Sequence, residues 1–71
     1  MDLAVQAQTY RYVPCRSHIE LLALQIDIEA DNYSIAKRRA RQLWEANDAH
    51  ADFAILRDFA GYLIWSSPST Q

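Results

Sequence analysis

Hydrophobic and polar positions divide this chain into an extended N-terminal arm and three segments with helical patterns. In the arm, residues 1–14, apolar and polar side chains alternate, and Thr9 to Val13 consist largely of residue types that favour strands. Pro14 lacks an amide donor and biases Val13 toward extended geometry, so it closes this segment. We therefore expect an extended arm or short strand before the first helix.

The segment 17–30 begins with a pattern typical of a helix N-terminus. Ser17 and Glu20 form an S-x-x-E capping box, in which each side chain accepts a hydrogen bond from the other residue's amide. Apolar residues then recur at helical spacing: Ile19, Leu22, Ala23, Ile26 and Ala30. The alternative is a half-buried strand, because residues 24–30 alternate strictly between apolar and polar types. We favour a helix because of the capping box.

A second helix is predicted over residues 33–46, after two good N-cap residues, Asp31 and Asn32. Its buried stripe would consist of Tyr33, Ala36, Ala40, Leu43 and Trp44. The other side would be basic. Four of the seven basic residues of the chain lie in this segment: Lys37, Arg38, Arg39 and Arg41.

A third helix is predicted over residues 49–65, and it is apolar around most of its axis. Between Phe53 and Trp65, the only strongly polar residues are Arg57 and Asp58. Such a helix must be buried on nearly all sides, which two short partner helices cannot achieve, so the pattern predicts a homodimer. The candidate partner or dimer interface is Phe59, Tyr62, Leu63 and Trp65. Gly61, within this helix, would mark a close approach to another helix.

Together these segments predict a single, mainly α domain over residues 1–71: a three-helix array of helical hairpins with the N-terminal arm and a tail at 66–71. Residues 31–36, followed by Ala40, Leu43, residues 47–48 and Ala51, resemble the second helix and connector of a tetratricopeptide repeat. The resemblance covers about a third of the chain and departs from the family at Leu24 and Asp27. We treat it as a similar packing arrangement, which would imply peptide binding on a concave face.

Length and composition limit the functional classes. At 71 residues, with 51% hydrophobic residues, one Gly and two Pro, the chain has enough apolar surface to fold and is too short for a second domain. A net charge of −2 is too close to neutral to indicate a nucleic-acid surface. A single cysteine, Cys15, suits a reducing compartment, and no signal segment or long apolar run is present. We therefore expect a cytoplasmic protein without membrane association.

Candidate chemistry is sparse. Cys15 could act as a nucleophile with His18 or His50 as the base, and these three residues with Asp48 or Asp52 have ligand types that suit zinc. One Cys-x-x-His without a second pair is a weak metal signal, however. One glycine excludes phosphate-binding loops, and carboxylate pairs such as Asp27 with Asp31 are better explained as surface acids. We expect no enzymatic activity, no cofactor and no metal.

The leading functional hypothesis is a small non-enzymatic protein–protein interaction module. It would bind a larger protein as an inhibitor or adaptor and act as a homodimer, as small regulators from phages or mobile elements often do. The alternative is a nucleic-acid-binding or transcriptional regulator that uses the basic surface from Lys37 to Arg41. A third hypothesis is a redox- or metal-responsive module built on Cys15.

Overall fold

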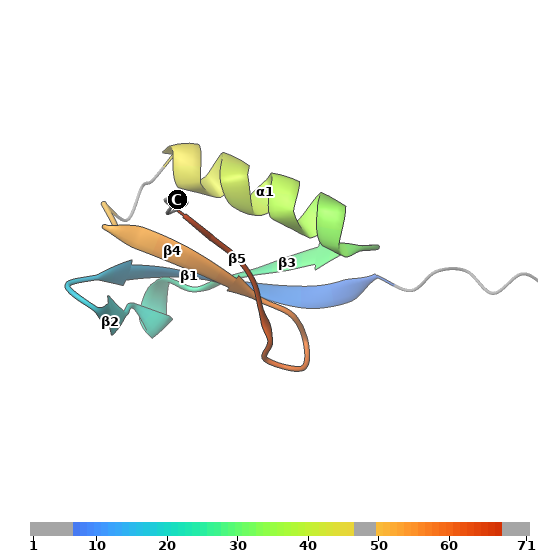
Figure 1. Cartoon of the computed structure of the whole chain (residues 1–71), viewed down its shortest axis with the longest axis horizontal. Helices are drawn as coiled ribbons and strands as arrows, with labels where there is room; N and C mark the ends of the chain where they lie inside the picture. The colour runs from blue at the N-terminus through green and yellow to red at the C-terminus, as the bar shows by residue number, and fades with distance from the viewer. Residues whose placement is uncertain (1–6, 47–49, 68–71) are drawn as a thin grey trace, which may run out of the picture.

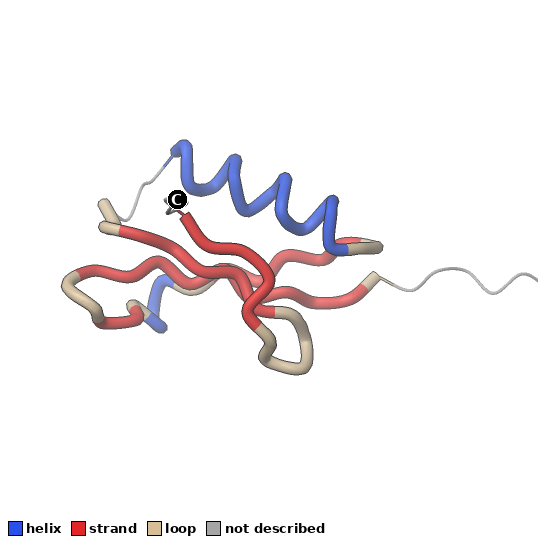
Figure 2. The backbone as a smooth tube through the Cα atoms, in the orientation of Figure 1, coloured by secondary structure: helices blue, strands red, loops and turns tan. Residues whose placement is uncertain are grey.

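The computed structural model describes residues 7–46 and 50–67, which form an antiparallel sheet with one helix on one of its faces (Figure 1 and Figure 2). The strands are β1 (Gln8–Arg16), β2 (Ile19–Glu20), β3 (Ile26–Ala30), β4 (Phe53–Arg57) and β5 (Leu63–Ser67). The helix α1 spans Tyr33–Ala46, and a short 3-10 helix, η1, spans Leu22–Leu24. The predicted mainly α array of three helices is therefore wrong, because only the helix at 33–46 forms as predicted.

β1 is the central strand of the sheet. One edge of β1 pairs with β4 through residues 11–15, and β5 pairs with the far side of β4. The other edge pairs with β3 along residues 8–12 and with β2 at residues 15–16. Since β3 and β4 are both antiparallel to β1, they run parallel to each other on its two sides. Their connection needs a crossover, and α1 supplies it.

The predicted helix at 17–30 is instead a hairpin followed by an edge strand. Ser17 and His18 both have positive φ, 53° and 66°, as a two-residue type I′ turn requires. The Ser17 amide donates to Oδ2 of Asp52 at 2.9 Å, so Ser17 and Glu20 form no capping box. A capping box contributes only about 1 kcal/mol to the stability of a helix. Pairing with β1 instead gives this segment backbone hydrogen bonds and buries Ile28 against α1. The strand alternative read from the alternation over 24–30 is correct for β3.

Pro14 does not close the first segment, because β1 continues through it to Arg16. The Pro14 carbonyl accepts a hydrogen bond from the Leu21 amide at 2.8 Å. In an antiparallel ladder, the N–H and C=O of one residue face the same neighbouring strand. Pro14 therefore lacks its amide on the side of β2, where the β1–β2 pairing ends and η1 begins. The proline therefore costs the sheet no regular hydrogen bond. The strand expected in the arm is present, and residues 1–6 lie outside the described residues.

The predicted helix at 49–65 is a second hairpin, β4–turn–β5. Its apolar character has a different cause: β4 lies between β1 and β5, and three consecutive residues, Ala54, Ile55 and Leu56, are buried. The Gly61 amide donates to the Asp58 carbonyl at 2.9 Å to close the turn, and Gly61 has φ 93°. A Cβ at Gly61 would meet nothing within 4 Å, so the predicted close helix approach is wrong. Residues 47–49 lie outside the described residues.

The helix at 33–46 forms as predicted, but Tyr33, which was predicted in its buried stripe, is 46% exposed. The Asn32 side chain accepts a hydrogen bond from the Ile35 amide at 3.0 Å, which confirms the N-cap. Ala36 and Ala40 are fully buried, and Leu43 and Trp44 pack against the same core. The resemblance to a tetratricopeptide repeat does not extend beyond this helix, because α1 packs on a sheet and the chain continues into β4.

Packing on the two faces of the sheet is unequal. The face under α1 carries the main core, in which Tyr10, Tyr12 and Leu56 meet the helix alanines. The opposite face has a smaller cluster of Val13, Cys15 and Ile55 with Phe53 packed against it. Apart from the short helix η1, which contacts β1, no helix covers this second face in the part of the chain that the structure describes. We refer to it as the open face, and the candidate site lies on it.

Candidate functional site

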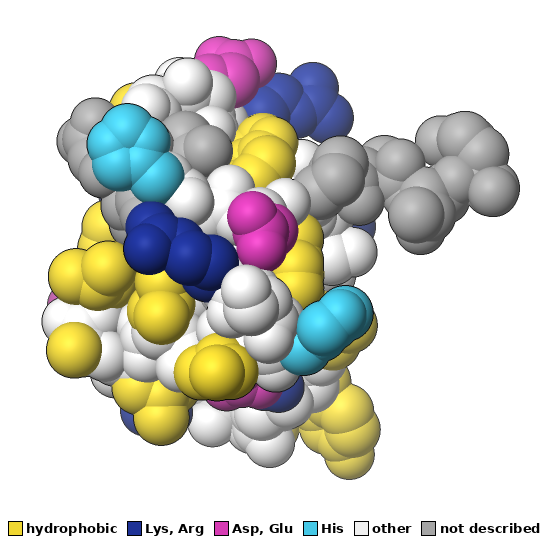
Figure 3. Space-filling model, turned by 90° about the vertical axis from the view of Figure 1, so that its left-hand side faces the viewer, with side chains coloured by type: hydrophobic (Ala, Val, Ile, Leu, Met, Phe, Trp, Pro, Cys, Tyr) yellow, Lys and Arg dark blue, Asp and Glu magenta, His cyan; other side chains and the backbone are white. Residues whose placement is uncertain are grey.

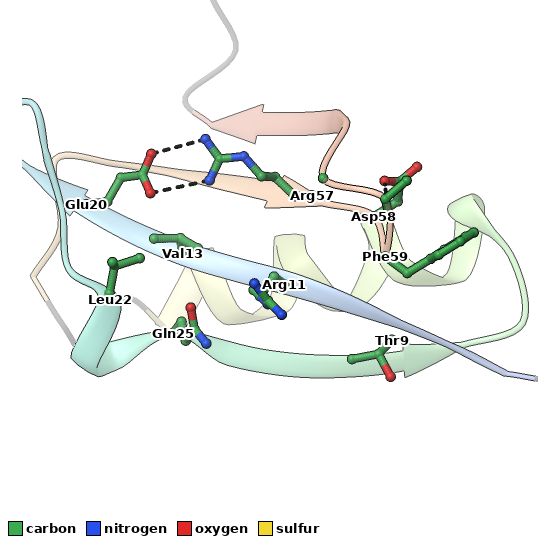
Figure 4. Close-up of a pocket in the computed structure, with 11 residues that line it drawn as sticks. Thr9, Arg11, Val13, Glu20, Leu22, Gln25, Arg57, Asp58 and Phe59 are labelled. Carbon is green, nitrogen blue, oxygen red and sulfur yellow. Dashed lines mark hydrogen bonds and ion pairs between the residues drawn. The ribbon is translucent and has the colours of Figure 1, made fainter.

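A groove of about 420 Å³ lies on the open face of the sheet (Figure 4). β1 contributes Thr9, Arg11 and Val13, which alternate with the buried tyrosines of the same strand. One wall comes from β2, η1 and the residue before β3, and the other comes from the end of β4 and the β4–β5 turn. The groove therefore joins segments from both ends of the chain.

Arg57, at the end of β4, forms a two-point contact with Glu20 of β2. Its Nη1 donates to Oε1 at 3.3 Å and its Nη2 donates to Oε2 at 3.1 Å. The hydrogen bond from Arg57 lowers the pKa of the Glu20 carboxyl. Both side chains are more than a third exposed, so water screens the pair and it adds little to stability. Its main effect is to fix the direction of the Arg57 side chain.

Arg11 lies directly opposite Arg57 in the β1–β4 pairing, so two positive side chains occupy adjacent positions on one face. Like charges in such cross-strand positions repel each other. Glu20 neutralises Arg57, but among the described residues the Arg11 side chain forms no hydrogen bond or ion pair. Arg11 is exposed and projects from β1 beside Gln25 (Figure 4). The groove thus presents one cation without an internal partner.

Asp58 organises the turn that carries the second wall. Its Oδ1 accepts hydrogen bonds from the amides of Ala60 at 3.0 Å and Tyr62 at 2.9 Å. Its Oδ2 accepts one from the Tyr33 hydroxyl at 2.8 Å, which ties the turn to the start of α1. Burial raises the pKa of the Asp58 carboxyl, but these donors outweigh it and hold the pKa below its ordinary value. Phe59 is presented from this fixed turn.

The four residues predicted as an interface separate into two groups. Phe59, Tyr62 and Leu63 cluster around the β4–β5 turn and are 68%, 71% and 59% exposed. Trp65 is half-buried on the helix side of the sheet, where its ring centroid lies 6.3 Å from that of Tyr12. The first three are available to a partner, whereas the Trp65 ring takes part in the core.

Further apolar side chains are exposed at the opposite end of the groove. Figure 3 shows that hydrophobic side chains cover much of the sheet side of the molecule's end that carries β2 and η1. Ile19 and Leu22 are 63% and 60% exposed there, and Leu24 is 48% exposed. The groove is therefore bordered by apolar groups at both ends, since Phe59 borders the other.

The predicted basic surface lies on α1, on the other side of the sheet from the groove. Lys37, Arg38, Arg39 and Arg41 are all exposed. Arg39 donates from Nη1 to the Glu29 carbonyl at 3.0 Å and so covers part of the β3 edge. None of the four lines the groove.

Cys15 is 1% exposed in the small cluster of the open face. Burial raises the pKa of its thiol, as does the Glu20 carboxylate, whereas Arg57 opposes the shift. A buried thiol with a raised pKa is a poor nucleophile, and its Sγ lies 3.6 Å from the Val13 carbonyl oxygen. His18, the expected base, is exposed in the β1–β2 turn.

The metal hypothesis gains no support from the geometry. Within residues 7–46 and 50–67, no group of three His, Cys, Asp or Glu side chains could hold a metal ion. Asp48, one of the candidate ligands, lies outside that part of the chain. Asp52, another, accepts a hydrogen bond from the Ser17 amide, and the His50 carbonyl accepts two from the Arg16 side chain.

Comparison with models of protein families, with curated proteins and with solved structures finds no match for this chain. Among the described residues, no helix has the length and apolar character needed to cross a membrane.

The groove residues Arg11, Glu20 and Arg57 were not predicted as site residues from the sequence. For Arg11 a signal existed: Thr9, Arg11 and Val13 alternate with two tyrosines, which is the pattern of a strand with one buried and one open face. Arg57 and Glu20 carried no such signal. They are 37 positions apart and meet only because both β2 and β4 pair with β1.

Proposed function

We propose that this chain is a non-enzymatic protein-interaction module that forms a homodimer through β5 and inhibits or adapts a larger protein. The observation that carries the proposal is the character of β5. It is the last strand of the sheet order β2-β1-β4-β5, so its outer edge has no neighbouring strand among the described residues. An edge of this kind offers unpaired N–H and C=O groups to another strand.

β5 lacks the features that normally protect an edge. Its sequence, Leu-Ile-Trp-Ser-Ser, contains no charged residue and no proline. The exposed side chains of Tyr62, just before β5, and Leu63, its first residue, would be removed from water by a partner strand. Both features favour strand addition at β5.

The opposite edge of the sheet is protected. β3 carries the charged residues Asp27 and Glu29, and the Arg39 side chain donates a hydrogen bond to the Glu29 carbonyl. η1 separates β3 from β2, so no straight run of free edge groups exists there. Pairing with another strand is therefore favoured at β5 alone of the two edges.

A second copy of this chain is the occupant that best fits β5. Two copies of an uncharged strand can pair antiparallel about a two-fold axis without bringing like charges together. The two sheets would then continue into each other, and each copy of this small domain would gain buried apolar surface that it cannot gain alone. The open faces, with their grooves, remain free to contact a larger protein.

Light scattering on the purified protein tests this proposal. We expect a molar mass of twice the chain mass of 8.2 kDa at micromolar concentration. Ser66→Lys places a charge on exposed β5 and should yield a folded monomer, because a lysine on an edge strand disfavours pairing with another strand. Gln42→Lys makes the same change on exposed α1 and should leave the dimer intact. A monomeric wild type, or equal masses for the two variants, would contradict the proposal.

A further inference from the structure

The Arg11 side chain is the feature of the groove that no internal contact explains. It lies opposite Arg57 on the adjacent strand, a position in which two guanidinium groups repel each other. Glu20 relieves Arg57, and among the described residues nothing pairs with Arg11. Asp27 lies opposite Arg11 on the β3 side, but in the described part of the chain no ion pair joins these two side chains. A bound anion can therefore contact the Arg11 guanidinium directly.

The groove around Arg11 combines this charge with apolar and neutral polar groups. Gln25 and Thr9 lie on either side of Arg11, and Val13 forms part of the floor (Figure 4). Leu22 and Phe59 border the groove with side chains that are 60% and 68% exposed. A ligand that fits these surroundings carries one negative group with apolar groups beside it.

We propose that the groove binds an aspartate or glutamate carboxylate in an extended segment of the partner protein, with apolar side chains of that segment on Leu22 and Phe59. The Arg11 guanidinium would donate charge-assisted hydrogen bonds to the carboxylate. The planar fork of guanidinium donors matches the geometry of a carboxylate. This inference rests on the proposed function as a protein-interaction module, and it names the chemistry of the larger protein's segment.

The charge balance of the groove argues against a polyanion. Its titratable lining consists of Arg11, Arg57, Glu20 and Asp58, two charges of each sign. Asp27 also lies opposite Arg11 on the β3 side. With two charges of each sign, the groove can bind a single carboxylate at Arg11. A nucleic-acid backbone would place several phosphates near the carboxylates of Glu20 and Asp27, which would repel them.

Glu20 has a second consequence for the ligand. Its carboxylate already occupies Arg57 in the two-point arrangement that a ligand carboxylate would adopt. Glu20 therefore competes with the ligand for one of the two guanidinium groups and restricts binding to Arg11. Removing its charge should free Arg57 and strengthen binding.

Fluorescence anisotropy with defined peptides tests the inference. The probe is a labelled eight-residue peptide of alternating serine and leucine with a single glutamate in place of one central serine, and its matched control has glutamine at that position. We expect the full chain to bind the glutamate peptide at least about 10-fold more tightly than the glutamine peptide at low salt. Arg11→Gln should abolish that preference, and Glu20→Gln should increase affinity for the glutamate peptide several-fold.

Controls separate this inference from simpler explanations. Arg38→Gln removes the same charge from exposed α1 and should leave the preference unchanged. Equal losses in Arg11→Gln and Arg38→Gln, no preference between the peptides, or stronger competition by a single-stranded oligonucleotide would each overturn it. Circular dichroism checks that each variant is folded. Light scattering on the same samples reads the β5 dimer separately, so the peptide result and the dimer result can fail independently.

Discussion

Replacing Leu56 with alanine is expected to leave a large fraction of the chain unfolded at 25 °C. Leu56 is fully buried in β4, opposite Tyr12 of β1 and Trp65 of β5. A buried leucine-to-alanine change costs about 2–5 kcal/mol. A core of this size supplies only about 3–5 kcal/mol of net stability, so the cavity consumes most of it.

Urea unfolding followed by tryptophan fluorescence measures this effect. Leu24→Ala is the matched control. It removes the same side-chain volume as Leu56→Ala, but Leu24 is 48% exposed in η1. We expect the control to lose less than about 1 kcal/mol at the same protein concentration. Similar midpoints for the two variants would contradict the placement of Leu56 at the centre of the sheet.

Asp58→Ala is expected to have the second-largest effect. The substitution removes the acceptor of two turn amides and leaves the Tyr33 hydroxyl without its partner. We expect the thermal midpoint to fall by about 10 °C. Tyr33→Phe removes only one of these hydrogen bonds and should cause a smaller fall. If Asp58→Ala melts at the wild-type temperature, the carboxylate does not organise the β4–β5 turn.

The Asp58 contribution should also depend on pH. The pKa of this carboxyl in the folded chain lies below its unfolded value of about 3.9. Its stabilising effect is therefore complete above that value and is lost as the pH falls through the folded pKa. The difference in thermal midpoint between wild type and Asp58→Ala should be largest near pH 7 and should shrink below about pH 4. A constant difference from pH 7 to pH 2 would contradict this role of the charge.

The sequence predicted α1 well because its signals are local. The cap at Asn32 and the spacing of Ala36 and Ala40 act within a few residues and agree with each other. The strand-favouring residues from Thr9 to Val13 likewise gave a correct local indication for β1. Where neighbouring residues decide the conformation, the pattern was sufficient.

The other two predicted helices failed because distant pairing decided their conformation. The S-x-x-E pattern at Ser17 is a valid local signal, but β1 offers residues 19–30 a paired edge and a buried face. The apolar run from Phe53 is typical of a helix buried on all sides, but a central strand has the same composition. Gly61, after Asp58, was the turn signal that could have divided that run.

The groove could not be predicted from the sequence for the same reason. Arg11 and Arg57 are 46 positions apart, and only the β1–β4 register places them side by side. Glu20 reaches Arg57 through a third strand. No spacing rule within one element connects these residues, whereas the basic run from Lys37 is conspicuous because it is contiguous.

The proposed role of β5 as the pairing edge is tested most directly by hydrogen–deuterium exchange at several protein concentrations. We predict that amides of Leu63–Ser67 exchange more slowly as concentration rises through the dimerisation range, because strand pairing protects them. Amides of β3, on the protected edge, should exchange at a rate that does not change with concentration. Exchange in β5 that is independent of concentration, or protection that grows in β3 instead, would contradict the account.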